Sequence, residues 1–367
     1  MSEILLLALV KRTATDRFRS IDALRGMAAI MVLVLHVGQS YINHPRVAAS
    51  GRGLLRFYEY VDLGRIGICI FFIISGFVIC RSFNSDRREL KSFVVKRFFR
   101  LYPLFWFSMI LAGLVLWPKH ASSLTPGIIG ANATMLPSLL GQPFMIGLYW
   151  TLETELLFYV LMSLLYWLGL LGRPKVMLAL TLLMYVLLSG LYFLPMAEQL
   201  MPHWKATPYH LSLMMLGVTT RYAYDAEGST RKPWLRILST HAVLLALVPL
   251  VILVLYLVTG QAAELPDAIA YLLGMLMFFV GLRYLRSAPG WMTYLGVITY
   301  SIYLLHPVVF TFVRQLLVRY DLLLGLHISV YIVLCGLLTV LLSAISYKYL
   351  EASANRVGRR CGRAAKS

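Results

Sequence analysis

Charged residues are scarce in this sequence, and acidic residues are the scarcest. Only 14% of the 367 residues are charged, and 16 Asp and Glu stand against 34 Lys and Arg, which gives a net charge of +18. A basic excess can serve nucleic-acid binding, but no recognisable nucleic-acid module is present and the basic residues lie between hydrophobic runs. We therefore expect no nucleic-acid partner and attribute the positive charge to membrane topology.

Cysteine is rare as well. Cys69, Cys80 and Cys335 lie in apolar runs, and Cys361 lies in a basic tail. Their spacing is not the paired spacing of a disulfide framework or of a metal site. We therefore interpret the cysteines as structural and expect no bound metal.

The chain also shows no secretory signal, internal repeat, low-complexity tract or linker between folded domains. The apolar stretch at 4–10 is too short to span a membrane and is followed by Lys11 and Arg12, which reverses the order of a signal peptide. The sequence predicts a cytoplasmic or interfacial segment at 1–20 and one transmembrane domain at 21–350. A basic cytoplasmic tail at 351–367 is expected beside anionic lipid head groups.

Hydrophobic residues are abundant by contrast. They make up 59% of the chain, the mean hydropathy is +0.75, and apolar runs recur along nearly the whole length. This pattern predicts an all-α fold, a polytopic membrane helix bundle. The expected spans are 21–41, 63–82, 101–117, 150–170, 176–195, 208–222, 237–259, 267–284, 292–313 and 325–347, of which the sixth has the weakest signal.

The basic residues predict the orientation of this bundle of about ten helices. If both termini are cytoplasmic, 26 of the 34 Lys and Arg residues fall on the inner side. The positive-inside rule favours exactly this kind of asymmetry. We therefore expect 85–96 to be cytoplasmic and 120–145 to be extracytoplasmic.

Two ionisable residues interrupt the first apolar run. Arg25 and His36 are eleven residues apart, so both project from one side of a helix, about 16 Å apart along its axis. Asp22 lies one turn before Arg25, where its carboxylate can pair with the guanidinium. In the plain interpretation Arg25 reaches the inner head groups and His36 is a packing residue. In the functional one both belong to a site, because ionisable groups are costly within a membrane.

Other ionisable residues are predicted at a depth similar to that of His36. Glu155 lies in the outer half of the fourth span and His306 in the outer half of the ninth, so the three groups can converge. Glu153 points to the helix face nearly opposite that of Glu155, so at most one of them faces the bundle. His306 precedes Pro307, which leaves a structural role at a kink as open as a catalytic one.

On the predicted cytoplasmic side, Arg97 and Arg100 lie one helical turn apart in "KSFVVKRFFRLYP". Such a pair suits phosphate groups, although a flank beside anionic lipid has the same composition. Ser75 and Gly76 fall in the middle of the second span. Small residues there serve close helix packing or, alternatively, leave a narrow passage for a substrate.

Five motifs together resemble the membrane acyltransferase-3 family. They are "IDALRGMAAIMVLVLHV" with its pattern of Arg, ten residues and His, "FFIISGF", the Arg-x-x-Arg of Arg97 and Arg100, "WTLETELLFY" and "YSIYLLHP". The motifs occur in the order of the family and extend over essentially all of the spans.

The resemblance implies an integral-membrane O-acyltransferase of the bacterial inner membrane. Proteins of this kind take an acyl group, usually acetyl, from cytoplasmic acyl coenzyme A. They pass it to a sugar hydroxyl of a surface or exported polysaccharide, either free or lipid-linked. Some carry a fused extracytoplasmic hydrolase-like domain, which this sequence does not contain, so we expect a stand-alone enzyme or one with a separate partner.

The resemblance also implies roles for individual residues. Arg25, Arg97 and Arg100 would hold the phosphates of acetyl coenzyme A, with the thioester roughly 15 to 20 Å deeper, near His36. His36 would be the general base, because an imidazole with an ordinary pKa of about 6.5 suits that task. Glu155 would orient His36 or bind the acceptor. Direct transfer and an acyl-histidine intermediate are both open. The supporting residues would be Asp22, Ser75, Tyr303 and His306.

Two other classes of function fit part of the pattern. A secondary transporter or glycan flippase also keeps ionisable residues within the membrane, although no inverted repeat is visible here. An accessory glycan-binding subunit would bind an acceptor without consuming a donor. Release of coenzyme A from acyl coenzyme A by the purified protein separates an enzyme from both.

Overall fold

The computed structural model describes residues 16–44, 47, 57–58, 60–83, 89–116, 124–193, 204–260, 265–323 and 325–364. Within these ranges all regular elements are helices, which confirms the all-α prediction. The longer ones are α2 (Asp16–Ile42), α4 (Leu63–Ile79), α5 (Glu89–Val115), α6 (Pro126–Ala133), α7 (Trp150–Trp167), α8 (Pro174–Phe193), α10 (Thr207–Asp225), α11 (Arg231–Thr259), α12 (Leu265–Tyr284), α13 (Gly290–Val297), α14 (Thr299–Arg319), α15 (Ile328–Ser346) and α16 (Ala352–Ala364). Most of the segment predicted at 1–20 lies outside the described residues.

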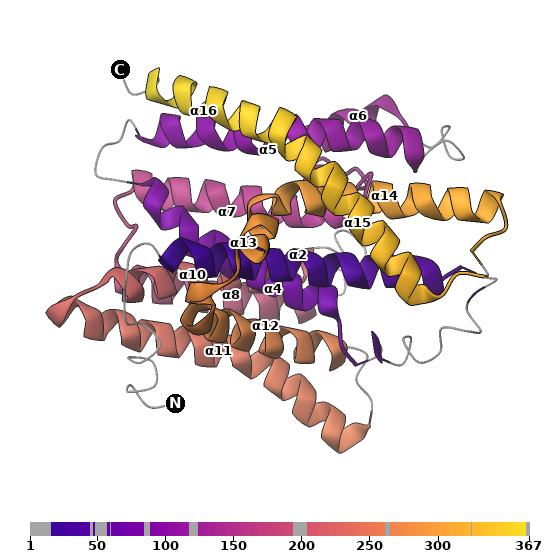
Figure 1. Ribbon diagram of the computed structural model, residues 1–367. Helices are drawn as coiled ribbons and strands as arrows, with labels where there is room; N and C mark the ends of the chain where they lie inside the picture. The colour runs from indigo at the N-terminus through magenta and orange to yellow at the C-terminus, as the bar shows by residue number, and fades with distance from the viewer. Residues whose placement is uncertain are drawn as a thin grey trace.

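Helices occupy each of the ten predicted spans. Seven helices of the described chain are long and apolar enough to cross a membrane, and α4 and the Pro174–Leu187 part of α8 are shorter apolar helices. The remaining one is α10, where the sequence signal is weakest. Figure 1 shows most of these helices running in roughly the same direction, as in a membrane bundle. The exact number of spans and the side of each terminus stay predictions.

The helices differ from the predicted spans at three places. Helix α5 begins at Glu89 rather than near 101, so Arg97 and Arg100 lie on this helix, one turn apart as expected. The span predicted at 292–313 is interrupted at Ile298, whose backbone leaves helical geometry between α13 and α14. The segment 351–367 was expected to be a tail, but a π-helical turn at Tyr347–Glu351 joins α15 to α16, which packs against α5.

The centre of the bundle is α4, which packs against α2, α10 and α12. Its contact with α10 is a close approach of two backbones. A Cβ atom on Gly76 would stand 1.7 Å from the carbonyl oxygen of Met214, and one on Gly217 would stand 1.9 Å from that of Ile73. Only glycine fits at these two crossing points, so the packing role predicted for Gly76 is confirmed.

A second glycine contact fixes the beginning of α2, which carries Asp22 and Arg25. A Cβ atom on Gly296 would stand 1.8 Å from the carbonyl oxygen of Asp22, and one on Gly26 would stand 2.6 Å from that of Met292. The short helix α13 therefore lies directly on α2. Because α13 leads into α14, this contact also sets where α14 begins relative to Arg25.

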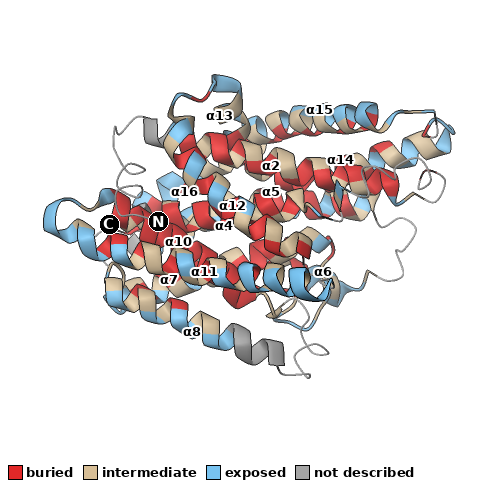
Figure 2. Cartoon of the chain, turned by 90° about the horizontal axis from the view of Figure 1, so that it is seen from below, coloured by how far each residue is buried: buried red, intermediate tan, exposed pale blue. Residues whose placement is uncertain are grey.

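The outer surface of the bundle is apolar over long helices. Val258 on α11 is 78% exposed and Leu337 on α15 is 67% exposed, and similar residues follow along both helices. Figure 2 shows buried residues gathered inside the bundle and exposed ones along these outer helices. A polytopic protein buries such a surface in lipid, so the burial pattern agrees with an integral membrane protein.

Candidate functional site

A cavity of about 370 Å³ opens inside the bundle between α2, α4, α5, α7, α14 and the beginning of α16. Seven residues singled out from the sequence line it, namely Asp22, Arg25, Ser75, Arg97, Arg100, Glu155 and Tyr303. They come from segments far apart in the sequence, so the fold gathers them. His36 and His306 are not among the lining residues.

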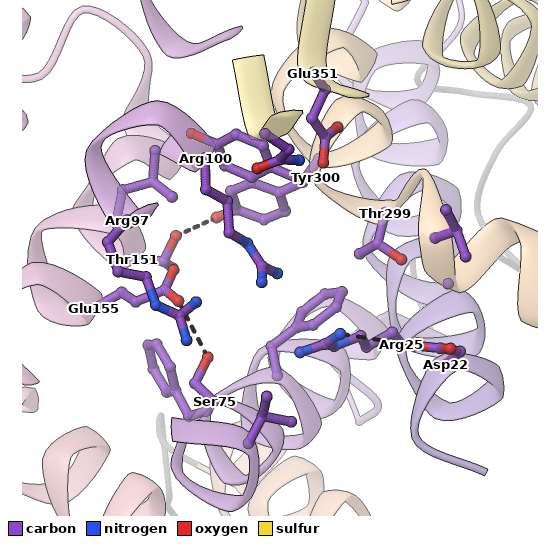
Figure 3. Close-up of a pocket in the computed structure, with 18 of the residues that line it drawn as sticks. Asp22, Arg25, Ser75, Arg97, Arg100, Thr151, Glu155, Thr299, Tyr300 and Glu351 are labelled. Carbon is purple, nitrogen blue, oxygen red and sulfur yellow. Dashed lines mark hydrogen bonds and ion pairs between the residues drawn. The ribbon is translucent and has the colours of Figure 1, made fainter. Parts of the chain in front are cut away.

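Three guanidinium groups meet in this cavity. Arg25 enters from α2, and Arg97 and Arg100 enter from successive turns of α5 (Figure 3). Arg25 lies 3.7 Å from the carboxylate of Asp22, which is the pairing expected from their spacing. Asp22, Glu155 and Glu351 line the same cavity and offset much of this positive charge, but three guanidinium groups close together still offer several hydrogen-bond donors to an anionic group of a ligand.

Arg97 and Arg100 differ in how the protein holds them. Arg97 donates to the hydroxyl of Tyr159 at 3.3 Å and to that of Ser82 at 3.4 Å, and its guanidinium lies 4.9 Å from the centre of the Tyr159 ring. Arg100 has no hydrogen-bonded partner in the part of the chain that the structure describes. Its guanidinium points into the cavity in Figure 3. Arg100 therefore has more donors available to a ligand than Arg97 has.

Two carboxylates face the arginines. Glu155 accepts hydrogen bonds from Ser75, at 3.3 Å, and from Tyr159. Glu351, in the π-helical turn, is buried and accepts a hydrogen bond of 2.8 Å from Ser301. Each carboxylate is thus oriented by a hydroxyl group, and the cavity has both donors and acceptors for a polar ligand.

One wall of the cavity is formed by Tyr303, Thr151 and Phe71. The hydroxyl of Tyr303 lies 2.6 Å from that of Thr151 and donates to the carbonyl oxygen of Leu148 at 2.9 Å. The ring of Phe71 lies 6.3 Å from the ring of Tyr303, edge to face. This wall separates the arginine cavity from the two histidines.

His36 and His306 form a pair just beyond that wall. Nδ1 of His36 lies 2.9 Å from Nε2 of His306, and the ring of His306 lies 6.1 Å from that of Tyr303. His306 follows Tyr303 by three residues, about one turn further along α14. The equal depth predicted for the two histidines is therefore confirmed. Pro307 lies inside α14, and the helix continues past it to Arg319.

The hydrogen bonds of this pair fix the tautomer of each neutral ring. Nδ1 of His306 lies 3.1 Å from the carbonyl oxygen of Ile302, which can only accept, so this nitrogen carries a proton. Nε2 of His306 is then an acceptor, and Nδ1 of His36 must donate to it. It follows that Nε2 of His36 carries the lone pair, and no described residue forms a hydrogen bond with it.

The structure does not place Glu155 beside His36. Glu155 lies with Ser75 and Tyr159 on the arginine side of the Tyr303 wall, and His36 is held by His306 instead. Glu153 points elsewhere, to the backbone and side chain of Ser138. The two glutamates therefore point to different places, as their spacing predicts, and Glu153 is buried as well.

Several cavity residues were missed from the sequence. Tyr159 follows Glu155 by one helical turn, and this spacing is a signal that could have revealed it. Three more are Glu351, Asn355 and Arg359, which belong to the segment interpreted as a tail. Their spacing of four residues marks one face of a helix, but the signal appears only once the segment is recognised as helical.

Comparison with known proteins identifies the family of the chain. The acyltransferase domain family matches residues 18–348, so the chain belongs to this acyltransferase-3 family of membrane proteins. The chain also resembles the acyltransferase MdmB of Streptomyces mycarofaciens, with 28% identity over 158 residues that cover 41% of this chain and 39% of the relative. No solved structure matches the chain.

Proposed function

We propose that this protein transfers an acyl group, most simply acetyl, from acyl coenzyme A to a hydroxyl group of a glycan. The observation that carries the proposal is the cavity with three arginines, one of which has no hydrogen-bonded partner among the described residues, near a histidine pair. Coenzyme A has about four negative charges on its phosphates, and arginine binds phosphate through paired hydrogen bonds. The guanidinium groups of the cavity therefore suit the phosphates of the acyl donor.

The spacing between Arg25 and His36 is compatible with the length of the donor. The backbone positions of Arg25 and His36 are about 16 Å apart along α2, and the pantetheine arm of coenzyme A extends over a similar length. The phosphates would bind at the arginines and the thioester would lie past Tyr303, near His36. Tyr303 and Phe71 would then flank the pantetheine arm, between the phosphates and the thioester.

His36 is proposed as the general base. Nε2 of His36 would take the proton of the acceptor hydroxyl while its oxygen attacks the thioester carbonyl, and the carbon–sulfur bond would break. The same proton would pass to the leaving thiolate, so the products are an acyl ester and free coenzyme A. His306 would hold His36 in the tautomer that this step needs. Attack by Nε2 on the thioester, through an acyl-histidine, uses the same nitrogen.

The acceptor is proposed from the resemblance, which implies a sugar hydroxyl of a surface or exported polysaccharide. A cytoplasmic arginine cavity and a histidine pair in the outer half of a bacterial inner membrane would separate donor from acceptor. The acyl group would then cross most of the membrane on the donor.

Turnover with purified components tests the proposal. Protein in detergent or nanodiscs is incubated with acetyl coenzyme A and a polysaccharide extract, and both free thiol and ester-linked acetate are measured. Matched release of coenzyme A and formation of ester support an acyltransferase. Glycan movement across vesicles without loss of the thioester would instead support a flippase, and glycan binding alone would support an accessory subunit.

A further inference from the structure

The C-terminal helix α16 lies at the edge of the arginine cavity, although its sequence looks like a lipid-facing tail. The π-helical turn Tyr347–Glu351 comes directly before α16, and the buried Glu351 ties that turn to Ser301 of α14 through a 2.8 Å hydrogen bond. The direction of α16 is therefore set by the bundle. In Figure 1 α16 runs over α5.

Two glycines hold α16 against α5. A Cβ atom on Gly358 would stand 2.6 Å from Cβ of Phe99, and one on Gly362 would stand 3.0 Å from Cε of Lys96. These glycines are one helical turn apart and form the face of α16 that contacts α5. They leave the neighbouring faces free for other contacts.

One neighbouring face points into the cavity. Glu351, Asn355 and Arg359 are spaced by four residues, and all three line the cavity that holds Arg97 and Arg100. From Glu351 to Arg359 this row is about 12 Å long. Arg359 is exposed at the mouth, and the described chain offers its side chain no hydrogen-bonded partner.

The charges of α5 and α16 also favour the binding of an anion. Helix α16 carries Arg356, Arg359, Arg360 and Arg363 alongside the basic residues of α5. No ion pair connects α16 to an acidic side chain among the residues that the structure describes. Like charges on packed helices repel, and a bound polyanion relieves that repulsion.

We infer that Asn355 and Arg359 of α16 form the outer part of the donor site and bind the phosphate-bearing nucleotide end of acyl coenzyme A. This inference rests on the proposed function. Arg25, Arg97 and Arg100 hold the inner phosphates, and the amide and guanidinium of α16 hold the end of the molecule nearest the cytoplasm. A phosphate of an anionic lipid has the same chemistry, but the row of α16 residues faces the cavity and not the outer surface.

Equilibrium binding of coenzyme A to the full-length protein in nanodiscs of zwitterionic lipid tests the inference. Arg359→Ala should weaken binding about tenfold, which corresponds to one charge-assisted hydrogen bond. The matched control is Arg360→Ala, which removes the same charge one position further along at an exposed site outside the cavity. It should leave the affinity unchanged. Acetyl-pantetheine lacks the nucleotide and its phosphates. Wild type, Arg359→Ala and Arg360→Ala should therefore turn it over at equal rates.

Each other outcome has a defined meaning. Equal affinities for wild type and Arg359→Ala overturn the inference but leave the proposed function intact, provided that wild type binds and turns over acetyl coenzyme A. Equal losses in Arg359→Ala and Arg360→Ala indicate a general charge effect and also overturn it. If the affinities of wild type and Arg359→Ala differ only in nanodiscs that contain anionic lipid, Arg359 interacts with lipid head groups and the inference is overturned. If wild type neither binds coenzyme A nor consumes its acetyl ester, the proposed function itself fails.

Discussion

Nδ1 of His36 and Nε2 of His306 lie 2.9 Å apart, and the carbonyl oxygen of Ile302 lies 3.1 Å from the other nitrogen of His306. The two hydrogen bonds that link these groups run in one direction, from His36 to His306 and from His306 to the carbonyl of Ile302. Because the carbonyl can only accept, Nδ1 of His306 carries a proton, and Nδ1 of His36 carries the proton that is donated to Nε2 of His306. The lone pair of His36 is therefore on Nε2. A residue that serves as a base needs this orientation, whereas a packing histidine does not.

The first prediction concerns His36 itself. In His36→Gln the amide can still donate to Nε2 of His306, so the fold is kept, but an amide is not a base near neutral pH. Acyl transfer to glycan should fall by roughly two to four orders of magnitude. The affinity for coenzyme A should stay normal because Arg25 is about 16 Å away along α2 and His36 does not line the arginine cavity. Near-normal turnover in well-folded protein would rule out His36 as the base.

The second prediction separates the two histidines. His306→Gln keeps an oxygen that accepts from His36 and an amide that donates to Ile302, whereas His306→Leu keeps neither. The glutamine variant should retain more turnover than the leucine variant, whose His36 is free to adopt the other tautomer. We expect a loss of about tenfold to a hundredfold in kcat for His306→Leu, with coenzyme A affinity unchanged. Equal activity of the two variants would contradict the tautomer argument.

Sequence periodicity was enough to predict the helical class, and the resemblance to the acyltransferase-3 family brought Arg25, Arg97 and Arg100 to one site. Arg97 and Arg100 share a helix face by spacing alone, and the position of Arg25 follows from its place at the inner end of a span. The partner of His36 was harder to predict, because Glu155 and His306 both lie at suitable depths. Depth along a helix does not tell which face meets which neighbour, and here the Tyr303 wall lies between Glu155 and the histidines.

The contribution of α16 could not be predicted for a different reason. Composition shows a basic segment after the last apolar run, and such a segment suits lipid head groups as well as a helix. The deciding features are the close approach of Gly358 to Phe99 and the anchoring of Glu351 by Ser301. Both are tertiary contacts, which a local pattern does not contain.

The third prediction compares the two arginines of α5. Arg100→Ala should weaken coenzyme A binding by about 2 kcal/mol, roughly thirtyfold in Kd, with no loss of thermal stability, since Arg100 has no protein hydrogen bond to lose among the described residues. Arg97→Ala should weaken binding and also lower the melting temperature, because Arg97 contacts Tyr159 and Ser82. Arg100→Lys should restore only part of the affinity. Unchanged donor affinity in both alanine variants would assign the pair to lipid.

The fourth prediction concerns the crossing of α4 and α10. In Gly76→Val the new Cβ would overlap the carbonyl of Met214, 1.7 Å away, and neither backbone can move without separating the helices. The cost should exceed about 3 kcal/mol, seen as loss of monodisperse protein in size-exclusion chromatography. Gly113→Ala is the matched control because nothing lies within 4 Å of its Cβ position. That variant should stay within about 1 kcal/mol of wild type.

The last prediction concerns orientation, on which the proposed donor side depends. Cys361 is exposed, so Cys361→Ser provides the background, and new cysteines are introduced singly at exposed positions as Lys91→Cys on α5 or Leu140→Cys before α7. With an impermeant thiol reagent, Leu140→Cys should be labelled in intact cells, and Lys91→Cys only after permeabilisation, because the segment near Lys91 is rich in basic residues. The reverse pattern would place the end of the bundle nearest Lys91 outside the cell. Cytoplasmic acyl coenzyme A could not reach an arginine cavity opening there, and the donor assignment would fail with the topology.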